Sequence, residues 1–153
     1  MKMNLQTFFF ICGGCGKEYE ALELPSSQYG QLSLRCIPSN RLLFLDALND
    51  PVYEEVAAIL TNIRAAPKEG TVEFADILHG LFHVACDKPQ GEKCGIGTEP
   101  VCTYCGHNVP TSWRESSPPV LTACDVPSVT HNEWDGLSKE QKVKRVKAAL
   151  GAA

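Results

Sequence analysis

The sequence predicts an α+β fold, because two helical patterns near its middle lie between segments that favour strands and turns. The chain has 153 residues, enough for one domain with its own hydrophobic core. Apolar residues make up 44% and charged residues 21%, which indicates a folded protein rather than a disordered one. We therefore expect a single domain over 1–153.

Strands are expected at the start of the chain and around its last third. Residues 6–11 and 19–24 are β-prone, and 32–36 alternates apolar with polar side chains. The run 41–48 is apolar throughout and suits either a strand or a helix. We expect 1–45 and 100–136 to form a β part that also binds metal.

Helical patterns are clearest over 50–86. Asp50 is a good N-cap, and Pro51 suits the first helical position. Apolar residues then recur at helical spacing to about residue 66, and again over 73–86. The Gly- and Pro-rich stretch 87–99 is predicted to be a loop. A last helix is expected over 138–151.

The segment 106–136 contains four prolines and little periodicity. A stretch this long inside a compact domain has to be held in place by contacts elsewhere. Trp113 and Trp134 lie in this segment, and we expect both to anchor it to the core.

The eight cysteines are the unusual feature of the composition. In a short secreted chain they would indicate four disulfides, but this chain is long enough for a core without them. Two Cys-x-x-Cys pairs, Cys12/Cys15 and Cys102/Cys105, are each followed by glycine. Zinc is bound by four such ligands in a tetrahedron, and the glycine permits the positive φ of a tight turn. We interpret the pairs as one metal site.

Each pair resembles the knuckle of a zinc ribbon, the Cys-x-x-Cys-Gly turn that occurs twice in such proteins. The resemblance covers about ten residues around each pair and not the 86 residues between them. It implies one structural Zn²⁺ in a small β unit, and the wide gap implies a large helical insertion over 50–86. The complete set of four cysteines leaves no position open for a substrate.

Sequence spacing alone does not fix which cysteines share an ion. Cys102 and Cys105 also fit a local site with Cys124 and His131, which would hold the long segment. Cys12 and Cys15 fit a site with Cys36 and one further ligand.

A second constellation lies on the helix predicted over 73–86. His79, His83 and Cys86 fall on one helical face, and Cys94 follows after a short loop. Together they offer two histidines and two cysteines to a second metal. The spacing is that of His-Glu-x-x-His peptidases, but Gly80 stands where the catalytic glutamate belongs, so peptidase chemistry is not inferred. The alternative is a pair of half-exposed histidines beside a buried thiol.

Charge is unevenly distributed along the chain. Residues 138–153 hold five basic side chains and one acidic one, a net charge of +4. The whole chain has a net charge of −4, so the other residues together carry −8. An acidic body is a poor surface for nucleic acid, and only the helix over 138–150 offers one. Its alternative role is to dock an apolar face on the core with its lysines in solvent.

Three functions follow from these patterns. The first is a structural zinc protein that acts as an interaction module for a protein partner, with no catalytic residue assigned. The second is a metalloenzyme with a second metal at His79, His83 and Cys86. The third is a nucleic-acid-associated zinc ribbon that uses the basic helix. The apolar run 8–11 is too short for a secretory signal, and no stretch reaches the length of a membrane span. We therefore expect a cytoplasmic protein with reduced thiols.

Overall fold

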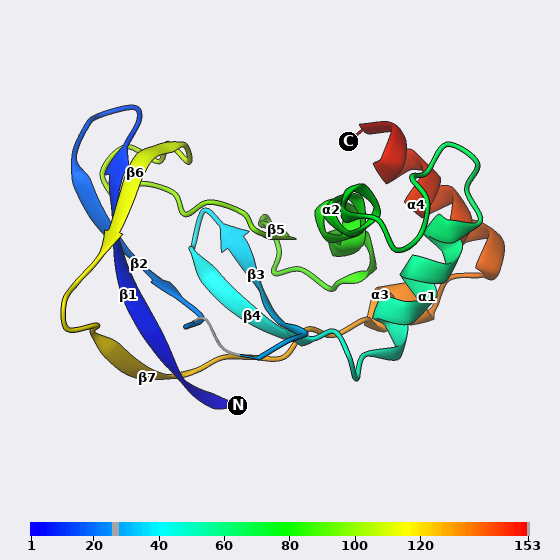
Figure 1. Cartoon of the computed structure of the whole chain (residues 1–153), viewed down its shortest axis with the longest axis horizontal. Coiled ribbons are helices and arrows are strands. Elements are labelled where there is room, and N and C mark those ends of the chain that lie inside the picture. The colour runs from blue at the N-terminus through cyan, green and yellow to red at the C-terminus, as the bar shows by residue number, and fades with distance from the viewer. Residues whose placement is uncertain (26–27, 153) are drawn as a thin grey trace.

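The computed structural model describes residues 1–25 and 28–152 and has an α+β fold with two antiparallel sheets and a helical layer (Figure 1). Sheet A, on the left of Figure 1, is built on a long central strand; its strands are β1 (Lys2–Cys12), β2 (Glu18–Glu23), β6 (Pro110–Glu115) and β7 (Leu121–Asp125). Sheet B lies between sheet A and the helices; its strands are β3 (Gln31–Ile37), β4 (Arg41–Asp46) and β5 (Lys93–Ile96). The helices are α1 (Pro51–Thr61), α2 (Val72–Leu81), the 3₁₀ turn η1 (Phe82–Ala85), α3 (Asn132–Asp135) and α4 (Lys139–Ala152).

Sheet A joins the two ends of the sequence. Strand β1 pairs with β2 along one edge, and with β7 and then β6 along the other. The segment 106–136, which lacked periodicity in the sequence, therefore supplies two strands to the sheet that begins at residue 2. Pairing with β1 is part of what holds this long segment in place.

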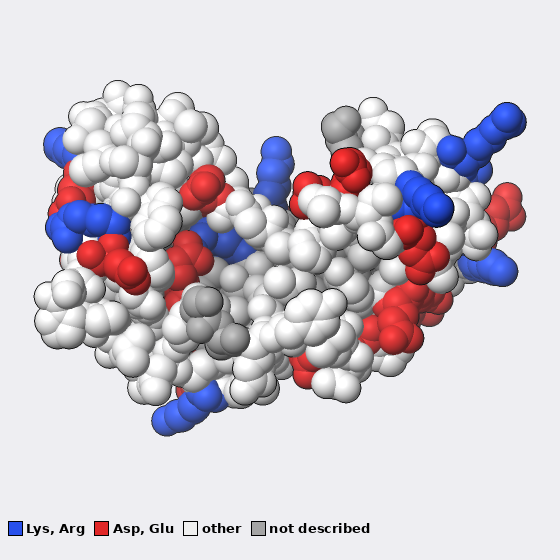
Figure 2. Space-filling view, in the orientation of Figure 1, with Lys and Arg blue, Asp and Glu red and all other residues white. Residues whose placement is uncertain are grey.

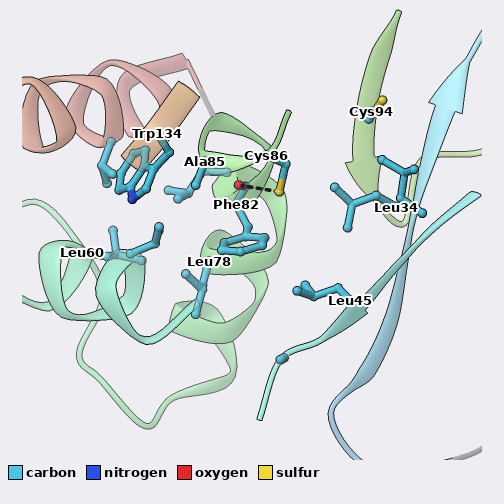
Figure 3. Packing of buried hydrophobic residues seen from close by; sticks show 14 of the residues in the cluster. Leu34, Leu45, Leu60, Leu78, Phe82, Ala85, Cys86, Cys94 and Trp134 are labelled. Atoms are coloured by element: carbon cyan, nitrogen blue, oxygen red, sulfur yellow. Dashed lines mark hydrogen bonds between the residues drawn. The ribbon is translucent and has the colours of Figure 1, made fainter. Parts of the chain in front are cut away.

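The main core lies between sheet B and the helices (Figure 3). Phe82 and Leu34 are fully buried there, as are Leu60 of α1 and Val146 of α4. Strand β4 is buried on both faces, because Leu43 and Leu45 belong to this core while its other side chains pack toward sheet A. A strand covered on both faces reads as a continuous apolar run, which explains the ambiguity of 41–48.

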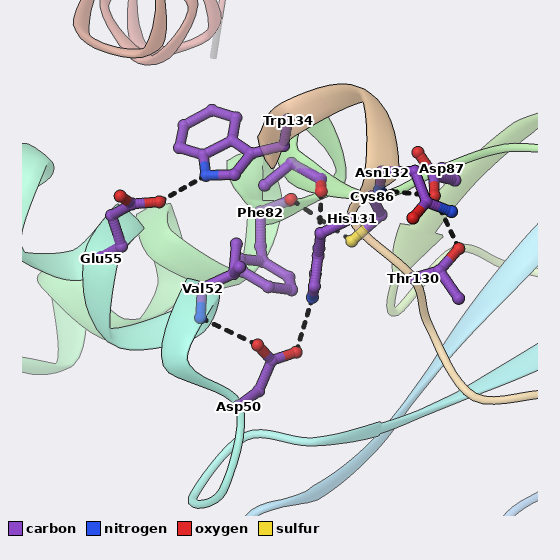
Figure 4. A network of polar contacts seen from close by, with 11 residues as sticks. Asp50, Val52, Glu55, Phe82, Cys86, Asp87, Thr130, His131, Asn132 and Trp134 are labelled. Carbon is purple, nitrogen blue, oxygen red and sulfur yellow. Dashed lines mark hydrogen bonds and ion pairs between the residues drawn. The ribbon is translucent and has the colours of Figure 1, made fainter. Parts of the chain in front are cut away.

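The predicted helix signals are confirmed at the start of α1. The Asp50 side chain accepts a hydrogen bond from the backbone N–H of Val52 at 2.9 Å, and Pro51 occupies the first turn. The same carboxylate also contacts His131 Nε2 at 2.7 Å, which ties the helix start to the segment before α3 (Figure 4). This capping residue is therefore also a tertiary contact.

Two details differ from the sequence predictions. Residues 93–96 form strand β5 within the predicted loop, because they pair with β3 at the edge of sheet B. Trp134 anchors the core as expected, at 1% exposure, with its indole N–H donating to Glu55 at 2.5 Å. The same expectation is wrong for Trp113, which is 63% exposed on β6. Of the helices in the described ranges, none is long and apolar enough to cross a membrane.

We predict that Phe82→Ala lowers the free energy of unfolding by about 3–5 kcal/mol, because it empties a fully buried aromatic site. Urea unfolding followed by circular dichroism measures the change. Val72→Ala, at a side chain 74% exposed on α2, is the matched control and should shift stability by less than about 0.5 kcal/mol. Equal effects of the two substitutions would contradict the assignment of the core.

Candidate metal centre

Both Cys-x-x-Cys pairs fold into the same tight turn. In the first, Cys12 N–H donates to the Lys17 carbonyl at 2.9 Å, and Gly16 N–H donates to the Cys12 carbonyl at 3.0 Å. In the second, the corresponding bonds run from Cys102 to His107 at 2.7 Å and from Gly106 to Cys102 at 2.9 Å. The repeated sequence motif is thus a repeated structure, with each cysteine pair at the tip of its turn.

A glycine after the second cysteine is required in each turn. Gly16 has a φ of 74° and Gly106 a φ of 78°, in the left-handed region that other residues rarely adopt. Close approach explains a further glycine, Gly13, since a Cβ there would lie 2.4 Å from the Val109 carbonyl oxygen. The backbone N–H of Gly13 donates to that same oxygen at 3.0 Å. The two turns are therefore in direct backbone contact.

The four sulfurs of the two turns meet in one cluster. Cys12 Sγ lies 3.4 Å from Cys105 Sγ, and Cys15 Sγ lies 3.7 Å from Cys102 Sγ. All four sulfurs lie within 4.8 Å of one another. Sulfurs at the corners of a tetrahedron around zinc, with Zn–S near 2.3 Å, are separated by about 3.8 Å. The cluster therefore has the spacing of a four-thiolate metal site.

Backbone N–H groups surround the sulfurs. Cys12 Sγ accepts from the N–H groups of Gly14 at 3.2 Å and Cys15 at 3.4 Å, and Cys102 Sγ accepts from Tyr104 at 3.4 Å. Cys12 and Cys102 are each 2% exposed, whereas Cys15 and Cys105 face solvent. The inner thiolates are thus stabilised by main-chain donors, and the outer ones lie on the side open to an arriving ion.

The thiols of Cys12 and Cys105 have pKa values that are shifted in opposite directions. The N–H of Cys15, together with that of Gly14, lowers the pKa of Cys12 to about 6 despite its burial. The N–H of His107 acts to lower the pKa of Cys105, but the neighbouring sulfurs and desolvation outweigh it and raise that pKa to about 11. Without a cation the cluster therefore favours one thiolate and opposes the ionisation of another. A divalent ion would remove this opposition, since it binds the deprotonated form of every ligand.

Two side chains outside the motifs position the second turn, and sequence reasoning missed both. The side-chain amide of Asn40 forms two hydrogen bonds with the backbone of Val101: it donates to the carbonyl at 2.9 Å and accepts from the N–H at 2.8 Å. Tyr19 donates its hydroxyl to the Pro100 carbonyl at 2.8 Å. A φ of 62° at Asn40, inside the Pro38-Ser39-Asn40 turn, is a local feature that asparagine favours. Its partner, 61 residues away, has no sequence signal.

The two alternative groupings of cysteines are not brought together among the residues that the structure describes. Cys36 forms a disulfide with Cys94 and so does not join Cys12 and Cys15. Cys124 lies on β7 opposite Met3. His131 is engaged by the Ala85 carbonyl at 2.6 Å and by Asp50, so neither ring nitrogen is directed at Cys102 (Figure 4).

The second constellation is dispersed in the structure. Cys94 is in the disulfide, and Cys86 donates its thiol to the Phe82 carbonyl, with burial raising its pKa to about 12. His79 Nε2 contacts the Tyr53 hydroxyl at 3.0 Å, and His83 Nδ1 contacts Lys88 Nζ at 3.1 Å. Over residues 1–25 and 28–152 these four side chains do not form a metal-binding group.

The Cys36–Cys94 disulfide joins residues that face each other in the pairing of β3 with β5, 58 residues apart. It fixes the short strand β5 to sheet B directly before the chain leads into the second turn at Cys102. From the sequence Cys94 was only a candidate ligand of a second metal, and no local pattern marks the cross-strand pair that it forms.

Comparisons of the chain with protein families, curated proteins and solved structures gave no match.

We predict that alkylation of the denatured, chelator-treated protein without reductant modifies six cysteines, and that prior reduction exposes all eight. Mass spectrometry counts the adducts. The Cys36→Ser/Cys94→Ser double variant should lose about 4 kcal/mol of stability, the loop-closure entropy expected for a 58-residue separation. Eight modified cysteines without reductant would contradict the disulfide.

The two helix histidines should make the protein acid-sensitive. Desolvation lowers the pKa of His79 and of His83, and Lys88 lowers the latter further. Below the unfolded pKa near 6.5 the unfolded chain binds more protons, so stability falls as the pH falls. In thermal melts between pH 7.5 and 5, His79→Gln/His83→Gln should therefore show a shallower decline than the parent. Parallel pH profiles would contradict a structural role for these imidazoles.

Proposed function

We propose that the chain is an interaction module whose sheet A is held closed by one structural Zn²⁺ bound to Cys12, Cys15, Cys102 and Cys105. The observation that carries the proposal is the four-sulfur cluster, with all sulfurs within 4.8 Å although the two turns lie about 90 residues apart in sequence. Zinc is the ion of choice for a four-cysteine tetrahedron. Four thiolates complete its coordination, so the ion holds segments together rather than activating a substrate.

The need for an ion follows from the small core beneath sheet A. The cluster of buried residues there contains only Phe10, Cys12, Tyr19, Ala21 and Cys102, two of which are ligands. The other end of sheet A packs on β4 through Leu5 and Phe44, so this small cluster leaves the turn end of the sheet with few apolar contacts of its own. Small units of this kind commonly rely on metals. Zinc would supply the missing cohesion at the open end of the sheet.

The segment that zinc would hold presents an apolar surface to solvent. Five large apolar residues between the second turn and β7 are exposed by about half or more; they are Tyr104, Val109, Trp113, Val120 and Leu121. Figure 2 shows few charges on the visible top of this lobe, where Figure 1 places the turns and β6. Trp113 lines a hollow with Phe8 and Phe10, so the face of sheet A that carries it is the candidate contact surface for another protein. We assign the partner of the module to this face.

A cytoplasmic location belongs to the same proposal, because zinc-binding thiols persist where the solvent is reducing. The buried Cys36–Cys94 disulfide is the opposing feature, since such bonds form in oxidising compartments. Whether Cys36 and Cys94 are oxidised in the producing cell distinguishes a reducing from an oxidising compartment.

We predict one zinc per chain in protein purified without chelator, measured by elemental analysis. Cys102→Ser or Cys105→Ser should lose the metal and lower the melting temperature by about 10 °C or more, because zinc binding is coupled to folding. Cys124→Ser, at a half-buried thiol on β7 outside the cluster, is the matched control and should keep both the metal and the melting temperature. Metal-free protein with reduced thiols and an unchanged melting temperature would overturn the proposal.

A further inference from the structure

At the end of the molecule away from the sulfur cluster, helices α1 and α4 enclose a hollow of about 680 Å³. Its floor is apolar and comes from both helices: Ala58, Ile59 and Ile63 of the α1 side, and Val143 of α4. The inner stripe of the same helices is fully buried, with Val56, Leu60 and Val146 at 0% exposure. The outer stripe of apolar residues is thus left half-covered.

The rim of this groove is basic. Lys139, Lys142 and Lys147 line it, against one carboxylate, Glu55. That carboxylate is already satisfied within the protein, because it accepts from Trp134 Nε1 at 2.5 Å and from Lys142 Nζ at 3.1 Å. Lys139 and Lys147 form no hydrogen bond or ion pair within the described part of the chain. The groove therefore presents two uncompensated positive charges to solvent.

These charges are arranged in register along α4. Lys139, Val143 and Lys147 are four residues apart and line both this groove and a second hollow beside it. At 1.5 Å rise per residue the two lysines stand about 12 Å apart along the axis, two helical turns, with the valine between them. Figure 2 shows basic side chains projecting at this end of the molecule, with acidic ones next to them.

We propose that the α1–α4 groove binds an acidic amphipathic helix of a protein partner. Apolar side chains at helical spacing would fill the floor between Ile59 and Val143. Carboxylates two turns apart on the partner would pair with Lys139 and Lys147, which sets the register and speeds association. This surface is separate from the face assigned above, so it gives the module a second contact of different chemistry.

Nucleic acid is the competing ligand for a basic helix, and the groove fits it less well. Single strands are held by aromatic side chains on which bases stack, whereas this floor is aliphatic. Outside residues 138–153 the chain carries −8, which opposes a long polyanion more than a short acidic helix.

The test titrates the full-length protein with a fluorescent 20-residue helical peptide that has leucines on one face and glutamates beside them. Anisotropy should rise with binding, and binding should weaken as salt is raised from 50 to 300 mM. Peptides with serine for leucine, or lysine for glutamate, should bind at least tenfold more weakly. A 20-nucleotide single strand and a 20-base-pair duplex of DNA are titrated in parallel.

The protein variants locate the contact. Lys139→Glu/Lys147→Glu should weaken peptide binding at least tenfold, whereas Lys2→Glu/Lys93→Glu, exposed lysines of the sheets with the same charge change, should leave it unchanged. Circular dichroism verifies that both variants fold, so the outcome does not depend on whether the sulfur cluster holds a metal. Absence of peptide binding, equal weakening by both variants, or tighter binding of either DNA would overturn the proposal. Self-association of the parent that is lost only in Lys139→Glu/Lys147→Glu would do so as well, because a second copy would then occupy the groove.

Discussion

The structure of sheet A depends on four sulfur atoms that are closer together than unshielded thiolates tolerate. The cross-turn pairs stand 3.4 and 3.7 Å apart. The backbone N–H of Cys15 lowers the pKa of Cys12, whereas the neighbouring sulfurs and desolvation raise the pKa of Cys105 against the N–H of His107. Folding brings the turns into backbone contact at Gly13 and Val109 and so creates this electrostatic conflict. The proposed divalent cation would resolve it and would add cohesion at the turn end of the sheet, where the buried cluster is small.

Sheet A, which carries the sulfur cluster, is joined to sheet B by three kinds of contact. Leu5 of β1 and Val126, which directly follows β7, pack with Phe44 on the outer face of β4. Arg35 of β3, only 3% exposed, pairs with Glu23 and also donates to the Leu22 carbonyl of β2. Desolvation raises the pKa of Glu23 in spite of this arginine, so the pair is costly to leave unmade. Loss of order at the sulfur cluster would therefore also destabilise sheet B.

Features encoded within a few residues could be predicted from sequence, and features that need a distant partner could not. The two cysteine turns and the Asp50–Pro51 helix start depend on local backbone geometry. Strand β5, in contrast, is short and contains a glycine, and it exists because β3 and a disulfide hold it. The two tryptophans illustrate the same limit, because both lie in the segment 106–136 and both were expected to anchor it to the core. Only tertiary contacts bury Trp134 against Glu55 and leave Trp113 exposed on β6.

The basic residues of α4 account for the charge asymmetry of the chain, and they fall into two groups: those that form ion pairs within the protein and those that point outward. Lys142 and Arg145 reach back to Glu55 and Glu133 and tie the helix to α1 and α3. The outward stripe of Lys139 and Lys147 has no such role, and exposed charges of this kind add little to folding stability. Val146 of this helix is completely buried in the core, and Ala149 and Leu150 pack against it. The outer lysines are therefore not required by the fold, which leaves them free to pair with the acidic helix proposed for the half-covered apolar floor beside them.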